Sequence, residues 1–345
     1  MSGGVDSSVA AALMVEAGHE VAGVTLKLWG GESDSGCCSV SDVDDARRVA
    51  HALGIEHHVF NYSQVFEEKV VTPYVEGIAA GVTPNPCIDC NRYIKFDVVM
   101  DRAERLGFDY VVTGHYARIR RENGVATLVR GVDPLKDQSY VLAHLRADRL
   151  EKLILPIGEM EKPAVRAEAQ RLGLKTWNKP DSQDVCFIEA SNGREAFLRT
   201  RIELTSARII DGDTGADLGE LPSAQLVTVG QRRGIAPGRD GERRYVKSVD
   251  LTTRQVHIAK LEDIVTRTVY LDEFDIQMMR GPVTEQRLRA QVSAHGRVYE
   301  GELLSGPWRF ESDSDLRPVA PGQTLVFYDR EVGDTVIGAA TVVAP

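Results

Sequence analysis

The spacing of hydrophobic residues divides the first part of the chain into alternating helices and strands. Three segments carry apolar side chains at helical spacing and end at a glycine: residues 9–17, 41–53 and 96–106. Three shorter apolar runs are typical of buried strands: residues 21–28, 55–60 and 110–113. This alternation predicts an α/β fold with a doubly wound parallel sheet and helices on both of its faces. Because ligands of such sheets bind beyond the carboxyl ends of the strands, we expect Gly3-Gly4 and Gly114-His115 to share one site.

A β-hairpin interrupts this alternation over residues 117–130. An Asn-Gly turn at 123–124 separates two strands of alternating polarity, which is a strong hairpin signal. Four arginines lie in these strands: Arg118, Arg120, Arg121 and Arg130. They either contact phosphates or form a solvated face, and the solvated face is the favoured interpretation for any one of them. The helical pattern resumes over residues 164–172.

After about residue 202 the pattern becomes that of an all-β protein. Turns rich in glycine and proline separate short runs of alternating polarity. Within residues 287–295 one face is apolar: Leu288, Ala290, Val292 and Ala294. The other face is polar and either meets solvent or contacts RNA backbone: Arg287, Arg289, Gln291, Ser293 and His295. We therefore predict three domains: an α/β domain over residues 1–201, a small β-rich central domain over 202–262, and a C-terminal β-barrel over 263–345.

Composition narrows the class of protein. The 345 residues are 43% hydrophobic, which is enough for several packed cores, and no apolar run is long enough for a membrane span. No secretory leader pattern opens the sequence, so a cytoplasmic location is expected. The net charge of −10 argues against indiscriminate nucleic-acid binding, and any RNA must therefore meet a local basic patch.

The first eight residues form a glycine- and serine-rich loop of the kind that holds phosphate. Gly3 and Gly4 allow the backbone to approach an anion closely, and the serines at positions 2, 7 and 8 add hydroxyl donors. The helix that follows directs its first N–H groups at the same place. No Gly-Lys-Ser or Gly-Lys-Thr occurs in the chain, which excludes a Walker A loop. The alternative is an ordinary serine-glycine turn.

Five cysteines, an odd number in a chain expected to be cytosolic, indicate catalytic or metal-binding thiols rather than a disulfide framework. Cys87 and Cys90 lie in Thr83-Pro84-Asn85-Pro86-Cys87-Ile88-Asp89-Cys90-Asn91, a loop stiffened by two prolines, and we expect a helix to start just after Cys90. The helix dipole and nearby cations would lower a thiol pKa there. Taken alone, the pair also fits half a zinc site or a redox pair, and Cys186 also fits an inert core residue.

Six motifs in this order resemble those of the tRNA-specific 2-thiouridylases of the MnmA type, which are PP-loop ATP pyrophosphatases. The motifs are SGGVDSS at 2–8, TPNPC-x-x-CN at 83–91, TGHYAR at 113–118, KDQSYVL at 136–142, SQDVCF at 182–187 and VGQRRG at 229–234. They span essentially the whole chain, and the resemblance implies that residues 1–201 form the catalytic, ATP-binding domain and residues 202–262 a tRNA-binding domain. The resemblance implies an enzyme that uses ATP to replace the C2 oxygen of the wobble uridine by sulfur, in tRNAs for Lys, Glu and Gln.

The resemblance also implies the roles of individual residues. Cys186 is expected to carry a persulfide. Cys90 is expected to be the catalytic nucleophile, which attacks the persulfide either to liberate sulfide or to resolve it as a Cys90–Cys186 disulfide. Asp6 is expected to help catalysis by holding Mg²⁺. ATP is expected to bind at the N-terminal loop, Leu26 and Gly114: Met1, Ser2, Gly3, Gly4, Val5, Asp6, Ser7, Ser8, Leu26 and Gly114. The tRNA is expected to contact Asn85, Pro86, Cys87, His115, Lys136, Asp137, Gln138, His295, Gly296 and Gln323. The sulfur donor is expected to be a cysteine desulfurase or a sulfur-relay protein.

Several alternatives stay open on the sequence alone. Some relatives carry Asp at position 87, so the extra thiol allows a [4Fe–4S] cluster on Cys87, Cys90 and Cys186 that activates sulfide. Other PP-loop ligases that adenylate a carboxylate, a 4-thiouridine synthetase and a non-catalytic RNA- or metal-binding module are weaker interpretations, because they leave the thiols or the ATP loop unexplained. No role follows for Cys37-Cys38.

Two features depart from the family pattern. Relatives have a short apolar strand before the SGGVDSS loop, and its absence here predicts a true start several residues upstream or a truncated chain. At Gly219-Glu220-Leu221-Pro222 relatives tend to have a Gly-Glu-His-x-Gly-like stretch, which affects only the central domain.

Overall fold

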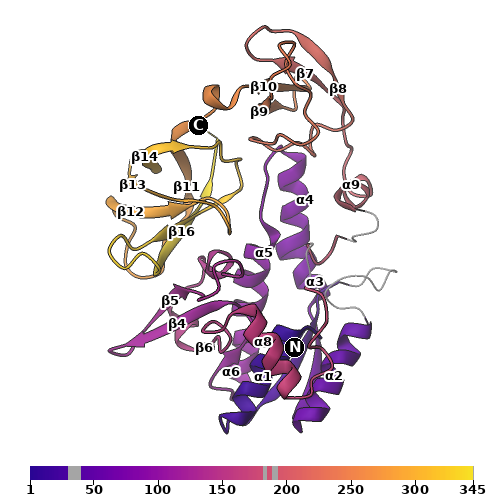
Figure 1. Cartoon of the computed structure of the whole chain (residues 1–345), viewed down its shortest axis with the longest axis vertical. Coiled ribbons are helices and arrows are strands. Elements are labelled where there is room, and N and C mark those ends of the chain that lie inside the picture. The colour runs from indigo at the N-terminus through magenta and orange to yellow at the C-terminus, as the bar shows by residue number, and fades with distance from the viewer. Residues whose placement is uncertain (30–39, 182–184, 189–192, 345) are drawn as a thin grey trace. The chain divides into compact units, whose positions relative to one another are not determined.

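The computed structural model describes residues 1–29, 40–181, 185–188 and 193–344, and these fall into two compact units (Figure 1). The first unit, called the α/β unit below, comprises Met1–Val71, Pro86–Ser191 and Asp334–Ile337. The second, called the β unit, comprises Thr72–Asn85, Asn192–Gly333 and Gly338–Pro345. None of the helices over the described residues has the length and apolar character that a membrane span requires.

The α/β unit is built on two pairs of parallel strands. β1 (Ala22–Lys27) pairs with β2 (Glu56–Asn61), and β3 (Val111–Val112) pairs with β6 (Leu153–Ile154). Over the described residues the two pairs are separate sheets, so the predicted parallel pairing is confirmed but not as one continuous sheet. The remaining helices of the first half are α2 (Val40–Leu53), α3 (Ser63–Phe66), the π-helix η1 (Glu67–Val71), the 3₁₀ turn η3 (Ser139–Leu142), α7 (Ala147–Glu151) and α8 (Lys162–Arg171).

The phosphate-loop helix α1 (Val5–Glu16) lies at the centre of the core of this unit. Its buried residues pack with those of α2 and α8: Val5, Val9, Ala12, Val49, Val165 and Ala169. The helix begins at Val5, four residues before the start that the apolar spacing predicts, because Gly4 in an extended conformation is its N-cap. Asp6, Ser7 and Ser8 therefore lie within the first turn.

The segment that carries Cys87 and Cys90 is helical throughout. Three pieces follow one another without a break: α5 (Pro86–Asp89), the π-helix η2 (Cys90–Val98) and α6 (Val99–Arg105). The prediction of a loop up to Cys90 is wrong, because Pro86 provides the first helical residue, a position where a missing N–H costs nothing and a fixed φ favours the helix. A π-helical stretch of this length is uncommon and is often found at functional sites.

The predicted hairpin is confirmed. β4 (Ala117–Glu122) and β5 (Val125–Arg130) pair antiparallel, and Asn123 and Gly124 both have positive φ, at 51° and 76°, as a type I′ turn requires. Arg121 is exposed, the other three arginines are half-buried, and all four have partners within the α/β unit. Arg118 and Arg120 bond Asp334, Arg121 donates to carbonyls of residues 150, 151 and 153, and Arg130 pairs with Asp137.

The β unit contains two β structures. A four-stranded sheet has the order β8 (Asp217–Leu221), β7 (Ala207–Asp211), β10 (Gln255–Ala259) and β9 (Tyr245–Asp250). A closed barrel has the order β11 (Thr266–Met278), β14 (Arg309–Leu316), β13 (Val298–Leu304), β12 (Gln286–Gln291), β15 (Thr324–Tyr328) and β16 (Val336–Val342). The helices are α4 (Thr72–Ala79), α9 (Gly193–Arg199) and the 3₁₀ turn η4 (Leu261–Asp263). The C-terminal barrel is thus confirmed.

The predicted strand over residues 287–295 ends at Gln291, and its alternation is wrong at one polar position. Leu288 and Ala290 are buried in the barrel, as expected. Gln291 is also buried, because its amide turns inward at the end of the strand and donates to the carbonyls of Ser293, Ala294 and Gly296. It therefore shapes the turn that carries His295 and does not belong to a surface for RNA.

Candidate active site

The N-terminal loop has the geometry of an anion cradle. Gly3 adopts a φ of +70°, and a Cβ at this position would lie 2.4 Å from the Asp42 carbonyl oxygen, so only glycine fits. The Ser2 N–H donates to Ser7 Oγ at 3.1 Å, which curls the loop over the first turn of α1. Ser8 Oγ donates to the Gly4 carbonyl at 2.8 Å and Ser8 is 1% exposed, so this hydroxyl braces the loop and does not face a ligand.

Two strand ends flank this cradle, as the fold predicts. Leu26 lies at the carboxyl end of β1, and Gly114 follows β3. A Cβ at Gly114 would stand 2.6 Å from the Asp6 carbonyl carbon and 2.7 Å from the Ser7 nitrogen, so the chain after β3 touches the start of α1. The structure thus brings Gly114 against the phosphate loop.

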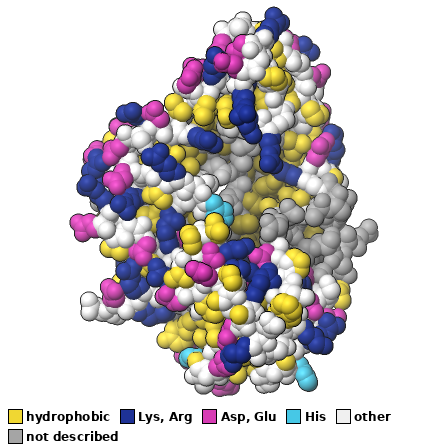
Figure 2. Space-filling view, in the orientation of Figure 1, with side chains coloured by type: hydrophobic (Ala, Val, Ile, Leu, Met, Phe, Trp, Pro, Cys, Tyr) yellow, Lys and Arg dark blue, Asp and Glu magenta, His cyan; other side chains and the backbone are white. Residues whose placement is uncertain are grey.

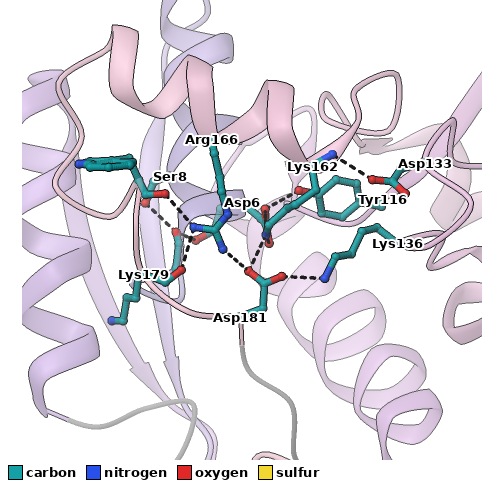
Figure 3. A network of polar contacts seen from close by, with 12 residues as sticks. Asp6, Ser8, Tyr116, Asp133, Lys136, Lys162, Arg166, Lys179 and Asp181 are labelled. Carbon is teal, nitrogen blue, oxygen red and sulfur yellow. Dashed lines mark hydrogen bonds and ion pairs between the residues drawn. The ribbon is translucent and has the colours of Figure 1, made fainter.

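A buried lysine closes the cradle on one side (Figure 3). Lys162 Nζ lies 2.8 Å and 2.9 Å from the two carboxylate oxygens of Asp6, and its residue is 8% exposed. The Tyr116 hydroxyl donates to the same carboxylate at 2.6 Å. Burial, followed by this hydrogen bond and the charge of Asp6, raises the Tyr116 pKa, so the phenol keeps its proton.

Asp181 collects three cations from three segments of the chain. Its carboxylate lies 2.8 Å from Lys162 Nζ, 2.7 Å from Lys136 Nζ and 2.8 Å from an Arg166 nitrogen. Burial raises the Asp181 pKa, but the hydrogen bonds from Lys136 and Lys162 outweigh it and hold the pKa at about 2. We call Asp6, Lys136, Lys162, Arg166 and Asp181, with Tyr116, the phosphate network.

The phosphate network has more positive than negative charge. Three cations face two carboxylates within hydrogen-bonding distance, which leaves one positive charge beside the phosphate loop. Backbone contacts fix its parts: Asp133 accepts the Lys162 N–H at 3.0 Å, and Arg166 also donates to the carbonyls of Trp177 and Lys179. An arrangement of this kind is organised before a polyanion binds, which is what stabilisation of charge on transferring phosphates requires.

Asp137 and Gln138 hold the backbone and side chains next to the phosphate network. Asp137 is 4% exposed and accepts hydrogen bonds from Arg130, the Gly131 N–H and Ser139. Gln138 Oε1 accepts the Tyr116 N–H at 2.9 Å. In this structure Lys136 binds Asp181, and Asp137 and Gln138 position their neighbours. The expected contact of these three residues with tRNA stays a prediction.

The cysteines lie on two segments that pack against residues 63–71. Cys87 is exposed and Cys90 is buried, in the first turns of the helix that begins at Pro86, and this helix contacts α3 and η1. Cys186 is partly exposed, and the next residue, Phe187, packs edge-on against Phe66 of α3 with ring centroids 5.8 Å apart. The segments of the two expected sulfur residues thus share one supporting element. Cys37 and Cys38 lie outside the described residues.

The first turns of the cysteine helix carry a polar relay. Lys95 Nζ donates to Asn91 Oδ1 at 2.9 Å, and Asn91 donates to the Val141 carbonyl at 3.2 Å. His115 stacks near Phe96 and shares a hydrogen bond of 2.8 Å with Thr113. Burial and the charge of Lys95 lower the His115 pKa well below its usual range, so its ring is neutral and apt to accept or donate one hydrogen bond.

The remaining expected tRNA contacts lie on the β unit, apart from Pro86 and Cys87. Gln323 donates to the Thr83 carbonyl, and the Thr83 N–H donates to the Pro321 carbonyl at 2.8 Å, so the barrel end holds the chain just before Asn85. His295 is exposed and Gly296 half-buried in the turn after β12.

The residues fit ATP better than they fit a metal centre. The cradle, the first turn of α1 and the excess positive charge suit a triphosphate. Within the described ranges no group of three or more His, Cys, Asp or Glu side chains is arranged to hold a metal ion. Asp6, the expected Mg²⁺ ligand, already binds Lys162 through both oxygens, and Cys87, Cys90 and Cys186 do not form such a group.

Sequence reasoning missed the centre of the phosphate network. Lys162 and Asp6 are 156 positions apart, and a single lysine after Glu161 at the start of a helix carries no distinctive signal. Asp181 and Arg166 also lie in no sequence pattern that predicts their role. The one available hint was that Asp181 directly precedes the SQDVCF motif.

Comparisons with known proteins agree with this geometry. Residues 1–190 match the model of the tRNA methyl transferase HUP domain, and residues 195–260 match that of the tRNA methyl transferase PRC-barrel domain. The chain is 44% identical to the tRNA-specific 2-thiouridylase MnmA of Mycolicibacterium vanbaalenii, over 100% of this chain and 98% of that protein. It is 43% identical to proteins of the same name from Mycobacteroides abscessus and Mycolicibacterium smegmatis, over 99% of this chain and 98% of each relative.

Proposed function

Since this chain belongs to the family of tRNA-specific 2-thiouridylases, we propose that it replaces the C2 oxygen of the wobble uridine by sulfur in tRNAs for Lys, Glu and Gln. The coarser activity, transfer of sulfur to a tRNA uridine with ATP, follows from family membership. One observation carries the finer proposal: the phosphate network and both cysteine-bearing segments belong to the same compact unit.

The first half of the reaction is adenylation. Uridine O2 attacks the α-phosphorus of ATP, the bond to the β-phosphate oxygen breaks, and pyrophosphate leaves into the cradle of Gly3, Gly4 and the first turn of α1. Lys162, Lys136 and Arg166 stabilise the negative charge that builds up on the departing phosphates. Their attraction to Asp181 is exchanged for attraction to phosphate, so they need little reorganisation.

The second half is sulfur transfer. Cys186 bears a persulfide, and its terminal sulfur becomes bonded to C2 while the C2–O bond breaks and AMP leaves with the original oxygen. The Cys90 thiolate attacks the Cys186 sulfur, which breaks the S–S bond and leaves a Cys90–Cys186 disulfide, and a thiol reductant opens it for the next cycle. Cys90 is buried in the second turn of the helix that begins at Pro86.

The proposed tRNA contacts are those near the target base and at the barrel end. Asn85, Pro86 and Cys87 line the base, and His115 offers a neutral ring beside the adenylation site. Gln323 fixes the chain before Asn85, and His295 and Gly296 meet the RNA from the turn after β12. A cysteine desulfurase or a relay protein supplies the sulfur.

The test separates the two halves. Purified protein is incubated with unmodified tRNA, ATP, Mg²⁺ and a sulfur source, and nucleosides are then analysed by mass spectrometry together with tRNA-dependent ATP–pyrophosphate exchange. We expect 2-thiouridine at the wobble position and exchange that requires tRNA. Exchange stimulated by a free carboxylic acid in place of tRNA would instead identify a carboxylate-adenylating ligase.

A further inference from the structure

A loop of the β unit presents four arginines that have no carboxylate partner among the described residues. Residues 232–245 form this loop, which we call the arginine loop. At its base the Gly230 N–H donates to the Val246 carbonyl at 2.8 Å, and the Val246 N–H donates to the Gln231 carbonyl at 3.0 Å. The Gln231 side chain accepts the Thr228 N–H and donates to the Arg233 carbonyl, so the base is held by both backbone and side chain.

A buried arginine anchors the loop from within. Arg244 is 3% exposed and lies 3.0 Å from Asp240, 3.4 Å from Asp211 and 3.5 Å from Asp213. A Cβ at Gly238 would stand 2.4 Å from its guanidinium, so glycine is required there for Arg244 to pack. The loop is therefore fixed to the sheet rather than loosely attached.

The acidic residues of the loop form ion pairs with Arg244 and Lys260. Asp240 pairs with Arg244, and Glu242 pairs with Lys260 at 2.6 Å. Four exposed arginines remain, without an ion pair to any described residue: Arg232, Arg233, Arg239 and Arg243. In Figure 2 basic side chains are visible over the part of the chain that carries β7 to β10 in Figure 1.

Four other surface arginines of the β unit are paired with carboxylates. Arg208 pairs with Asp217, Arg267 with Asp315, Arg287 with Glu302 and Asp313, and Arg289 with Glu300. In a chain whose net charge is −10, four neighbouring arginines without acidic partners stand out as a local positive field. Their guanidinium forks match phosphate oxygens in pairs.

The composition of the loop surface favours RNA over a protein partner. None of the exposed large hydrophobic side chains of the described chain lies between residues 228 and 250, and Ile235 and Ala236 pack inward on the core of the sheet. Stable protein interfaces need a buried apolar or aromatic centre, whereas contact with a nucleic-acid backbone needs only placed cations. We propose that the arginine loop binds the phosphate backbone of the substrate tRNA through Arg232, Arg233, Arg239 and Arg243, an inference that rests on the proposed function.

The experiment compares two variants that lose the same charge. One replaces the four loop residues by glutamine (R232Q, R233Q, R239Q and R243Q), and the control replaces four carboxylate-paired arginines (R208Q, R267Q, R287Q and R289Q). Affinity for unmodified tRNA is measured across salt concentrations, with ATP affinity and thermal unfolding as checks on the fold. We expect the loop variant to bind about 10- to 100-fold more weakly at low salt, with the slope of log affinity against log salt reduced by about 2 to 4, since each phosphate contact contributes about 0.7 to 0.9.

The outcomes separate the loop from the function as a whole. Wild-type affinity and slope in the loop variant, or an equal loss in the control variant, would overturn the proposal. A loss of binding to the sulfur-donating desulfurase with tRNA binding intact would assign the loop to a protein and would overturn it too. If the wild-type protein itself binds no tRNA, the proposed function has failed first. A second variant, R244M with D240N, loosens the anchor without touching the four contacts, and we expect it to weaken tRNA binding less than the loop variant does.

Discussion

The phosphate network and the start of the cysteine helix lie in one unit but differ in how their reactive side chains are held. In the network every charged group is fixed by at least one contact of 2.9 Å or shorter, and Lys162 is almost fully buried. At the start of the helix from Pro86, one thiol is exposed, the other is buried, and Lys95 donates a hydrogen bond to Asn91. In the proposed reaction, adenylation would use charges that are organised in advance, whereas sulfur transfer would use thiols that meet different partners in turn.

The largest expected effect is that of removing a thiol, which should stop sulfur transfer and leave adenylation intact. In Cys186→Ser or Cys90→Ser, we expect thiolation to fall on the order of a thousandfold or more, because no other group can carry or release the sulfur. ATP–pyrophosphate exchange with tRNA should stay within about threefold of wild type, because the phosphate network is untouched. In Cys87→Ser thiolation should fall less than in either of these variants, because Cys87 is proposed to line the base and not to carry or release the sulfur. Retained thiolation in Cys186→Ser, measured by nucleoside mass spectrometry, would overturn the persulfide assignment.

Removing the buried cation Lys162 should instead lower ATP–pyrophosphate exchange. In Lys162→Met we expect exchange to fall about a hundredfold, because charge on the leaving pyrophosphate loses a contact in a water-poor site. The variant also leaves Asp6 and Asp181 with less compensation, which should destabilise the fold by about 3 kcal/mol.

A double variant separates the two effects of Lys162. Adding Asp6→Asn to Lys162→Met removes the carboxylate left without its lysine, so thermal stability should partly return. Exchange should not. If the double variant regained exchange together with stability, Lys162 would be a structural residue only.

Acid should act on the network through Asp181. Its pKa is held at about 2, below the ordinary 3.8, so its contribution to stability is fully present above pH 3.8 and is lost as the pH falls toward 2. The shift corresponds to about 2 kcal/mol. Stability curves of wild type and Asp181→Asn should therefore differ at neutral pH and converge between pH 4 and 2. Parallel curves across that range would contradict the pairing with Lys136 and Lys162.

The smallest expected effect is that of the phenol. Tyr116→Phe removes one hydrogen bond to Asp6 and leaves the ring and its packing, so we expect a loss of about 1 kcal/mol and a change in exchange of a few-fold. Urea unfolding and exchange rates measure the two quantities. A loss of exchange as large as that of Lys162→Met would mean that the phenol itself contacts the reacting phosphates.

Local signals in the sequence predicted most of the fold but not the ion pairs of the site. The Asn123-Gly124 turn and the glycines that end the first helices are short-range features, and each fixes a nearby conformation by itself. The start of the cysteine helix was misplaced, because prolines at 84 and 86 fit a stiff loop and a helix start equally well. The pairing of Lys162 with Asp6 and of Lys136 with Asp181 depends on the packing of distant segments, which no local pattern encodes.

The partners of the charged side chains were the other part that sequence could not give. Arg118 and Arg130 belong to a motif that suggested phosphate or solvent, yet both bind carboxylates within the α/β unit. The arginine loop carries a similar density of arginine. Its four exposed arginines keep their charge because its acidic residues pair with Arg244 and Lys260. Which arginines stay available follows only from the folded arrangement.

The fate of the uridine oxygen tests the central claim most directly. A tRNA carrying oxygen-18 at C2 of the wobble uridine is incubated with the enzyme, ATP, Mg²⁺ and a sulfur source, and the released AMP is analysed by mass spectrometry. Adenylation of O2 followed by attack of sulfur at C2 predicts one oxygen-18 atom in the AMP phosphate for each 2-thiouridine formed. Unlabelled AMP alongside 2-thiouridine would show that the oxygen leaves by another route and would contradict the account.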